Sequence, residues 1–165
     1  MRLFTDLDRA LADVQRELSA IGLDDLINSV DIEESYGLDD LLTGAYGLFW
    51  PGARHRRIIG RITVPAFNLD VRNWFSGSRT SLRFVLRHEY GHALAHRLGL
   101  LGRPGRPWGY GTHVSSYALT NPDEDLAETV ALHLTLRGRF PYRRRDPDLL
   151  AEWRAAGALL RAGRS

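Results

Sequence analysis

Apolar residues recur every three or four positions in four parts of the chain. This spacing places them on one face of a helix and predicts four longer helices. The first runs to Ile21 and is followed by Gly22, a residue typical of helix ends. The predicted helices cover residues 5–21, 80–98, 122–136 and 147–162.

Capping residues precede each of these segments. A side-chain oxygen just before a helix accepts a hydrogen bond from a free backbone N–H, and proline is favoured at the first helical position. We expect Thr5 or Asp6 to cap the first helix and Ser78 or Thr80 to cap the second. The pairs Asn121-Pro122 and Asp146-Pro147 mark the starts of the last two.

Between the first two long helices the pattern changes twice. Residues 23–42 are acidic and leucine-rich and predict short helical pieces. Residues 45–50 and 57–64 are rich in β-branched and aromatic side chains, which predicts a hairpin or two neighbouring strands. Pro65 either ends the second strand or places it at a sheet edge. The fold class that follows is α+β, with a small twisted mixed sheet.

The length of 165 residues predicts one domain. Within it we expect a helical N-terminal part over 1–44, a central core over 45–137 and a C-terminal helix within 138–165. Residues 99–113 are rich in glycine and proline and predict a long loop. Loops of that length in a domain are usually functional or mobile.

The composition removes several kinds of chemistry. The chain has no cysteine, which excludes disulfides, cysteine-based zinc sites and thiol nucleophiles. All 22 basic residues are arginine, so lysine Schiff bases and P-loop chemistry are excluded too. Carboxylates, hydroxyls, arginines and six histidines remain. The formal net charge of +2 is nearly balanced and argues against nucleic acid as a partner.

No stretch of the sequence approaches the roughly 18 apolar residues of a membrane span. The first residues include an acid and lack an apolar signal core, so we expect a cytoplasmic protein without a membrane partner. Secretion by a route other than Sec stays open.

The second predicted helix contains His88-Glu89-Tyr90-Gly91-His92. Residues four apart on a helix lie on one face, so His88 and His92 can bind one metal ion. Glu89 lies about 100° around the helix, where its carboxylate reaches a water molecule beside the ion. This is the physical content of the H-E-x-x-H motif, two ligands and a general base.

A metal centre of this kind needs a third ligand. The metzincin pattern would place a histidine at position 98 and a glycine at 95, where this chain has Leu98 and Ala95. His96 lies a further turn along the helix, roughly 6 Å away, which favours another role. Glu124 and Glu128 share one face of the helix over 122–136. Either one can bind the metal while the other accepts the free N–H of a ligating histidine. Alternatively, Glu124 closes a capping box with Asn121 or Thr120.

The two segments HEYGHA and SYALTNPDEDLAE together resemble the gluzincin metallopeptidases. They are most similar to the catalytic domain of anthrax lethal factor and to a broad set of bacterial zinc-binding metallopeptidases. In those proteins a tyrosine precedes the ligand glutamate by seven residues and a second glutamate follows it by four. Tyr117, Glu124 and Glu128 keep both spacings. The resemblance covers roughly residues 80–136.

The resemblance implies a zincin-like domain whose catalytic core is residues 45–137, with one Zn²⁺ per chain. It assigns His88, His92 and Glu124 as ligands and Glu89 as the base. It also implies that Tyr117 steadies the developing oxyanion and that Glu128 supports a ligating histidine. In zincin folds an edge strand above the metal helix pairs with the substrate backbone. We expect Ile58, Gly60 and Ile62 to lie on that strand.

The function these features predict is zinc-dependent hydrolysis of a peptide bond in a protein or peptide, with narrow specificity. His113, four residues before Tyr117, is a further candidate for contact with the substrate carbonyl. Trp108 and Tyr110 either line a substrate pocket or anchor the loop. The alternative function is a zinc-stabilised binding module without catalysis. Its arginine runs at 54–57 and 143–145 would bind nucleic acid or an acidic protein.

Overall fold

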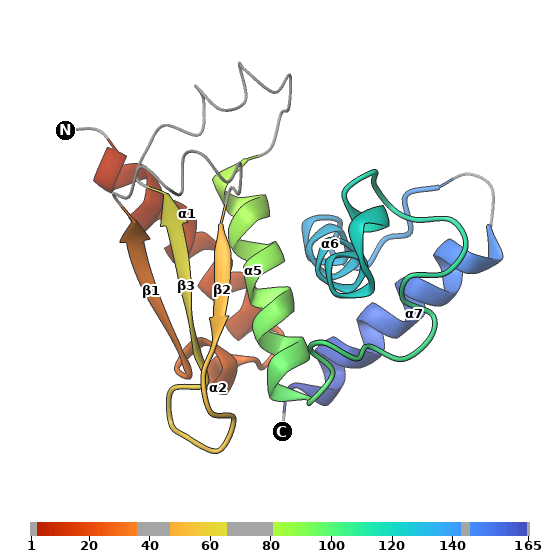
Figure 1. The fold of residues 1–165 in the computed structure, drawn as a ribbon. Helices are drawn as coiled ribbons and strands as arrows, with labels where there is room; N and C mark the ends of the chain where they lie inside the picture. The colour runs from red at the N-terminus through yellow and green to blue at the C-terminus, as the bar shows by residue number, and fades with distance from the viewer. Residues whose placement is uncertain (1–2, 36–46, 66–80, 143–145, 165) are drawn as a thin grey trace.

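A small sheet, a central helix and a pair of C-terminal helices follow one another across the protein (Figure 1). The computed structural model describes residues 3–35, 47–65, 81–142 and 146–164, and they form an α+β domain. The elements are α1 (Leu3–Ala20), α2 (Asp24–Ile27), β1 (Val30–Ser35), β2 (Leu48–Pro51), β3 (Gly60–Pro65), α5 (Leu82–Arg97), a 3-10 turn η1 (Ala118–Thr120), α6 (Pro122–Thr135) and α7 (Pro147–Ala162).

The sheet has the strand order β1-β3-β2 and is mixed. β2 and β3 are antiparallel, with Phe49 opposite Ile62, so the prediction of two neighbouring strands is confirmed. β1 runs parallel to β3 on its other side, with Ile32 opposite Ile62. Because β3 therefore has a partner on each side, Pro65 ends a central strand and not an edge strand.

The prediction that residues 23–42 form only helical pieces is wrong for residues 30–35. Val30 is buried, Asp31 is exposed and Ile32 is partly buried, which is the period of two that a strand requires. Four of the six residues of β1 are acidic or polar, and this composition hid the alternation. Asp24–Ile27 is helical as predicted, and residues 36–42 lie outside the described part of the chain.

The predicted apolar face of the first helix is the face that α1 buries. Leu7, Ala10, Val14 and Leu18 are each at most 9% exposed and belong to the core. The helix begins at Leu3, so Thr5 and Asp6 lie inside it and do not cap it. Terminal turns commonly extend a residue or two beyond a recognisable cap.

The remaining caps follow the predicted chemistry. Asn121 accepts hydrogen bonds from the backbone of Asp123 and Glu124, and Asp146 does the same at the start of α7. Each such cap stabilises its helix by about 1 kcal/mol. The cap of α5 is Ser81, which accepts from Phe84, whereas the predicted Ser78 and Thr80 lie outside the described residues.

Helix α5 is the central element, and it contacts α1, β2 and α6 (Figure 1). Arg87 on α5 makes a two-pronged ion pair with Glu17 on α1, at 2.7 and 2.9 Å, and donates to Thr135 at the end of α6. On another face, Gly91 lets α5 approach α6 closely. A Cβ at this position would lie 3.0 Å from the Cα of Ala127. This approach sets the distance between the two helices that carry the candidate site.

No helix in the described part of the chain is both long and apolar enough to cross a membrane.

Replacing Gly91 by valine should destabilise the protein by about 1–3 kcal/mol, because the added methyl groups meet the backbone of α6. Chemical denaturation of both proteins measures this difference. Ala12→Val on the exposed side of α1 is the control, and its helix-propensity effect should be below about 0.7 kcal/mol. If both substitutions have the same small effect, Gly91 does not set the helix separation.

Candidate metal centre

The two histidines of the H-E-x-x-H motif face the same point in space. His88 and His92 lie one turn apart on α5, and both are at most 8% exposed. Their rings are 4.7 Å apart and nearly perpendicular, with the two Nε2 atoms separated by 3.1 Å. Helical spacing on a buried stretch of α5 thus brings two ring nitrogens together, as predicted.

Glu124 provides the third atom from α6. Its Oε2 lies 2.9 Å from Nε2 of His88 and 3.4 Å from Nε2 of His92. Asn121 caps the helix without help from the Glu124 side chain, so the capping-box alternative does not describe this residue. Of the two candidate glutamates, Glu124 is the one whose carboxylate faces both histidines.

These three atoms have the spacing of metal ligands. A tetrahedral ion with bonds of about 2.0–2.1 Å holds its ligand atoms about 3.3 Å apart. The observed triangle has sides of 2.9, 3.1 and 3.4 Å. Oε2 of Glu124 is buried and makes no hydrogen bond, and the two ring nitrogens are its ion-pair partners. His88, His92 and Glu124 can therefore hold a metal ion.

The charges of the group favour a cation. Burial opposes the charged form of His88, but the carboxylates of Glu124 and Glu128 outweigh burial and raise its pKa to about 10. Burial also opposes the charged form of Glu124, but the two histidines lower its pKa to about 2. Positive charge at the His88 imidazole is thus stabilised by these carboxylates.

Glu128 holds His88 in place. Its Oε1 lies 3.0 Å from Nδ1 of His88, and its Oε2 accepts a 2.8 Å hydrogen bond from the hydroxyl of Ser115. The same hydroxyl accepts from the backbone of Ala118 in η1. A carboxylate at Nδ1 favours the proton there and leaves Nε2 free to bind a metal.

Glu89 and Tyr117 lie at the same pocket as the histidines. Burial raises the pKa of the Glu89 carboxyl, and one of its oxygens, Oε2, has no hydrogen-bond partner. The Tyr117 ring is 5.8 Å from that of His88 and 52% exposed, so it is not a core tyrosine. Burial and the nearby Glu124 raise the Tyr117 pKa to about 12, which keeps the phenol protonated as a donor.

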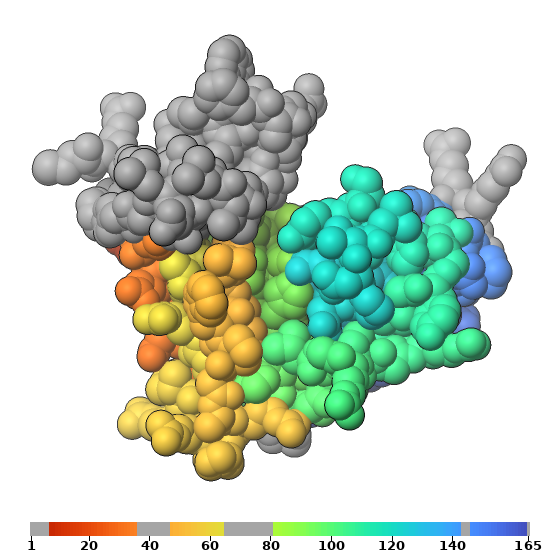
Figure 2. All heavy atoms as spheres, viewed as in Figure 1, coloured from red at the N-terminus to blue at the C-terminus, as the bar shows by residue number. Residues whose placement is uncertain are grey.

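The pocket has a volume of about 230 Å³ and is open to solvent. α5 forms its floor between β2 and η1 with α6, and Figure 2 shows α5 recessed between them. Its lining is Gly47, Leu48, Phe49, His88, Glu89, His92, Leu101, Tyr117, Asn121, Asp123 and Glu124.

Four predicted site residues lie elsewhere. His113 does not line this pocket, because its side chain is directed to Asp125, 3.2 Å away. The prediction that Ile58, Gly60 and Ile62 form a substrate edge is wrong, because β3 is the central strand and Ile62 is fully buried. In each case the local sequence did not indicate the partner, which is Asp125 for His113 and β1 for β3.

The strand that borders the pocket is β2. Its neighbour Gly47 lies against α5, where a Cβ would come within 3.0 Å of the Glu89 side chain. A glycine at the start of a strand signals such a close approach, and this signal could have been used. The sequence around Ser115 contains no signal for its role, because no local pattern marks a hydroxyl that donates a hydrogen bond to a distant glutamate.

Three other residues that the sequence singled out make structural contacts away from the pocket. His96 is close to the carbonyl oxygen of Gly52, at 2.8 Å, and does not face the other histidines. Trp108 is 3% exposed and anchors the loop in the core. Tyr110 is exposed and stacks with Arg106.

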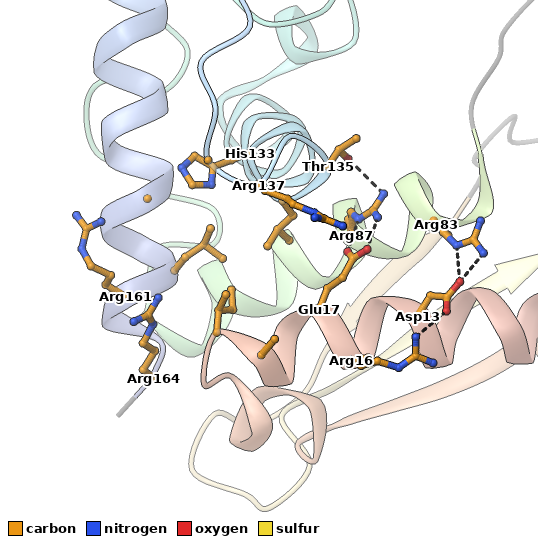
Figure 3. A pocket seen from close by; sticks show the side chains of 16 residues that line it. Asp13, Arg16, Glu17, Arg83, Arg87, His133, Thr135, Arg137, Arg161 and Arg164 are labelled. Atoms are coloured by element: carbon orange, nitrogen blue, oxygen red, sulfur yellow. Dashed lines mark hydrogen bonds and ion pairs between the residues drawn. The ribbon is translucent and has the colours of Figure 1, made fainter.

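A larger cavity of about 800 Å³ shares no residue with this pocket (Figure 3). Six arginines and two acids line it, and the acids, Asp13 and Glu17, pair with three of the arginines. Residues 54–57 do not line this cavity, and the run at 143–145 lies outside the described part of the chain.

The sequence matches no protein-family model, no curated protein and no solved structure. The geometry of the site is thus the basis on which a function can be proposed.

Glu128→Gln should weaken metal binding about 10- to 100-fold, because the amide no longer fixes the His88 proton as a carboxylate does. Zinc titration against a competing chelator measures this change. Glu33→Gln is the matched control, since Glu33 forms an exposed ion pair with Arg61. Equal affinities in the two variants would show that Glu128 does not support a ligand.

Proposed function

We propose that the protein is a zinc-dependent endopeptidase of the zincin fold and gluzincin type. The observation that carries this proposal is the convergence at one pocket of three ligand atoms, a free carboxylate oxygen and a phenol. The donor set of two imidazoles and a carboxylate is one that catalytic zinc uses.

The fit of the residues to zinc supports this choice of ion. The three ligand atoms have tetrahedral spacing, and Glu128 orients His88 from behind. Three protein ligands leave one position of a tetrahedral ion open, as in catalytic rather than structural sites. When bound, zinc supplies Lewis acidity and lowers the pKa of a water molecule to about 7.

Glu89 is positioned to act as the general base. Its unpartnered oxygen takes a proton from the attacking water as the water oxygen bonds to the carbonyl carbon. Glu89 then passes this proton to the amine nitrogen as the C–N bond breaks. Its raised pKa makes the buried carboxylate a stronger base than an exposed glutamate.

Tyr117 is positioned to stabilise negative charge. Its hydroxyl donates a hydrogen bond to the carbonyl oxygen, which gains charge when water attacks. The phenol stays protonated near neutral pH because its pKa is raised to about 12. Its exposure leaves room for a peptide to approach.

The substrate backbone would align with β2. Within the described residues, β2 has one strand neighbour, β3, and Leu48 and Phe49 line the pocket on the other side. Main-chain hydrogen bonds to such an edge bind an extended peptide with little regard to sequence, and pockets for its side chains provide selectivity. The expected substrate is therefore an extended segment of a protein or peptide.

Glu89→Gln should abolish cleavage, with a loss of about 10²- to 10⁴-fold or more in kcat, while zinc content stays unchanged. The amide keeps the shape of the side chain but cannot accept the proton. Cleavage of a peptide library, read by mass spectrometry, gives the activity, and elemental analysis gives the zinc. Glu33→Gln should leave both unchanged. Cleavage that survives in the Glu89 variant would exclude Glu89 as the base.

Tyr117→Phe should lower kcat by about 10²- to 10³-fold with little effect on KM, because its hydrogen bond forms mainly in the transition state. Tyr110→Phe, on the exposed loop residue outside the pocket, is the matched control and should keep wild-type rates. A rise in KM alone would assign Tyr117 to substrate binding instead.

A further inference from the structure

A second group of ligand-type side chains lies apart from the proposed active site. His113 comes from the connection between α5 and α6, Asp125 from α6 and Glu152 from α7. Nδ1 of His113 is 3.2 Å from Oδ2 of Asp125 and 3.8 Å from Oε1 of Glu152. Figure 1 shows the connection passing α7 before it enters α6. Three separate segments thus meet at one point.

The group is buried and its polar atoms lack partners. Asp125 and Glu152 are both 0% exposed. Nδ1 of His113, Oδ1 of Asp125 and both carboxylate oxygens of Glu152 make no hydrogen bond. Leaving one buried polar atom unpaired costs about 1–3 kcal/mol, and charged groups cost more. Four such atoms within one group indicate that something occupies the space between them.

The charge of the group identifies the kind of occupant. Asp125 and Glu152 place two buried carboxyl groups beside one imidazole, and ionised carboxylates this close together repel each other. A divalent cation between them cancels the negative charge of two ionised carboxylates. His113 adds one nitrogen donor to two carboxylates. Calcium and magnesium prefer oxygen ligands alone, and zinc and its transition-metal neighbours accept this mixture.

We propose that His113, Asp125 and Glu152 bind a second divalent transition-metal ion, with zinc as the expected occupant. Their ligand atoms lie within 4.8 Å of one another, and the two measured distances bracket the roughly 3.3 Å separation of ligands around a tetrahedral ion. The second site shares no residue with the first, so it does not depend on the proposed peptidase activity.

The second ion would have a structural role. It would join the connection to α6 and α7, and two hydrogen bonds already hold the neighbouring residues there. The backbone N–H of Gly109 donates to Asp125, and Thr112 donates to Asp146 at the start of α7. His113 lies four residues before Tyr117. The ion would thus fix the segment that leads to the phenol at the active-site pocket.

Zinc stoichiometry tests the proposal. The full chain, stripped with chelator, reloaded with zinc and desalted, should hold two zinc ions in native mass spectrometry and elemental analysis. His113→Asn and Glu152→Gln should each hold one ion. His88→Asn should also hold one, and the double variant of His88 and His113 none. A wild-type chain with one ion, unchanged by the His113 and Glu152 substitutions, overturns the proposal.

The zinc counts distinguish an error in the active-site proposal from an error in the second-site proposal. If the active-site proposal alone is wrong, wild type holds one ion, which His113→Asn removes and His88→Asn does not. If Asp125 and Glu152 instead share a proton, Glu152→Gln keeps the wild-type zinc content and melts at the same or a higher temperature. That outcome overturns the second site, because an amide can replace a protonated carboxyl group.

Thermal unfolding and crystallography provide readouts that do not need activity. Chelator should lower the wild-type Tm, and loss of the second ion should account for about 5–10 °C of this decrease when zinc is present at about 100 times its Kd. His113→Asn should lack that part of the shift. In crystals of the zinc-loaded chain, an anomalous peak among His113, Asp125 and Glu152 is expected. Its absence beside a peak at the first site contradicts the proposal.

Discussion

Lone pairs that face one another repel, and this repulsion constrains the centre of the protein. Three atoms of His88, His92 and Glu124 lie 2.9 to 3.4 Å apart, and the carboxylate oxygen among them makes no hydrogen bond. A positive charge among these atoms, either a proton on an imidazole or a bound metal ion, relieves this repulsion. Much of the surrounding structure holds these side chains in place, from the buried length of α5 to the Glu128–Ser115 hydrogen bond behind His88.

The close packing of α5 and α6 is what brings these three atoms together. Glu124 reaches the histidines of α5 because the two helices approach at Gly91 and Ala127, where a side chain on α5 would displace the backbone of α6. On another side of α5, Arg87 ties the helix to α1 and to the end of α6. Contacts on several faces therefore hold α5 in place, and they also fix the positions of its two histidines. A site on rigid elements keeps its geometry without rearrangement when a ligand binds.

The sequence predicted the elements whose chemistry is local. The spacing of His88, Glu89 and His92 and the cap at Asn121 depend on one helix each, and the structure agrees with them. The same holds for the buried face of α1. The local pattern could not choose between Glu124 and Glu128, because these residues lie on the same face of one helix and the choice depends on what lies opposite them.

The predictions about β3 and His113 failed because a partner far along the chain decides where each of them lies. β3 became a central strand because Val30–Ser35 pairs with it, and that acidic segment does not look like a strand. His113 was assigned to the substrate because Tyr117 is nearby in sequence. Its actual neighbours are Asp125 and Glu152, and the latter lies 39 residues further along on α7. Only the packing of α7 against α6 reveals that group.

The two ligand groups differ in how far along the chain they extend, and this sets the order in which they can form during synthesis. His88, His92 and Glu124 belong to α5 and α6, which pack directly against each other, so this group is complete before α7 has been made. His113 and Asp125 must wait for Glu152, 28 residues after Glu124. A chain emerging from the ribosome would therefore assemble the group of His88, His92 and Glu124 first and the group of His113, Asp125 and Glu152 last.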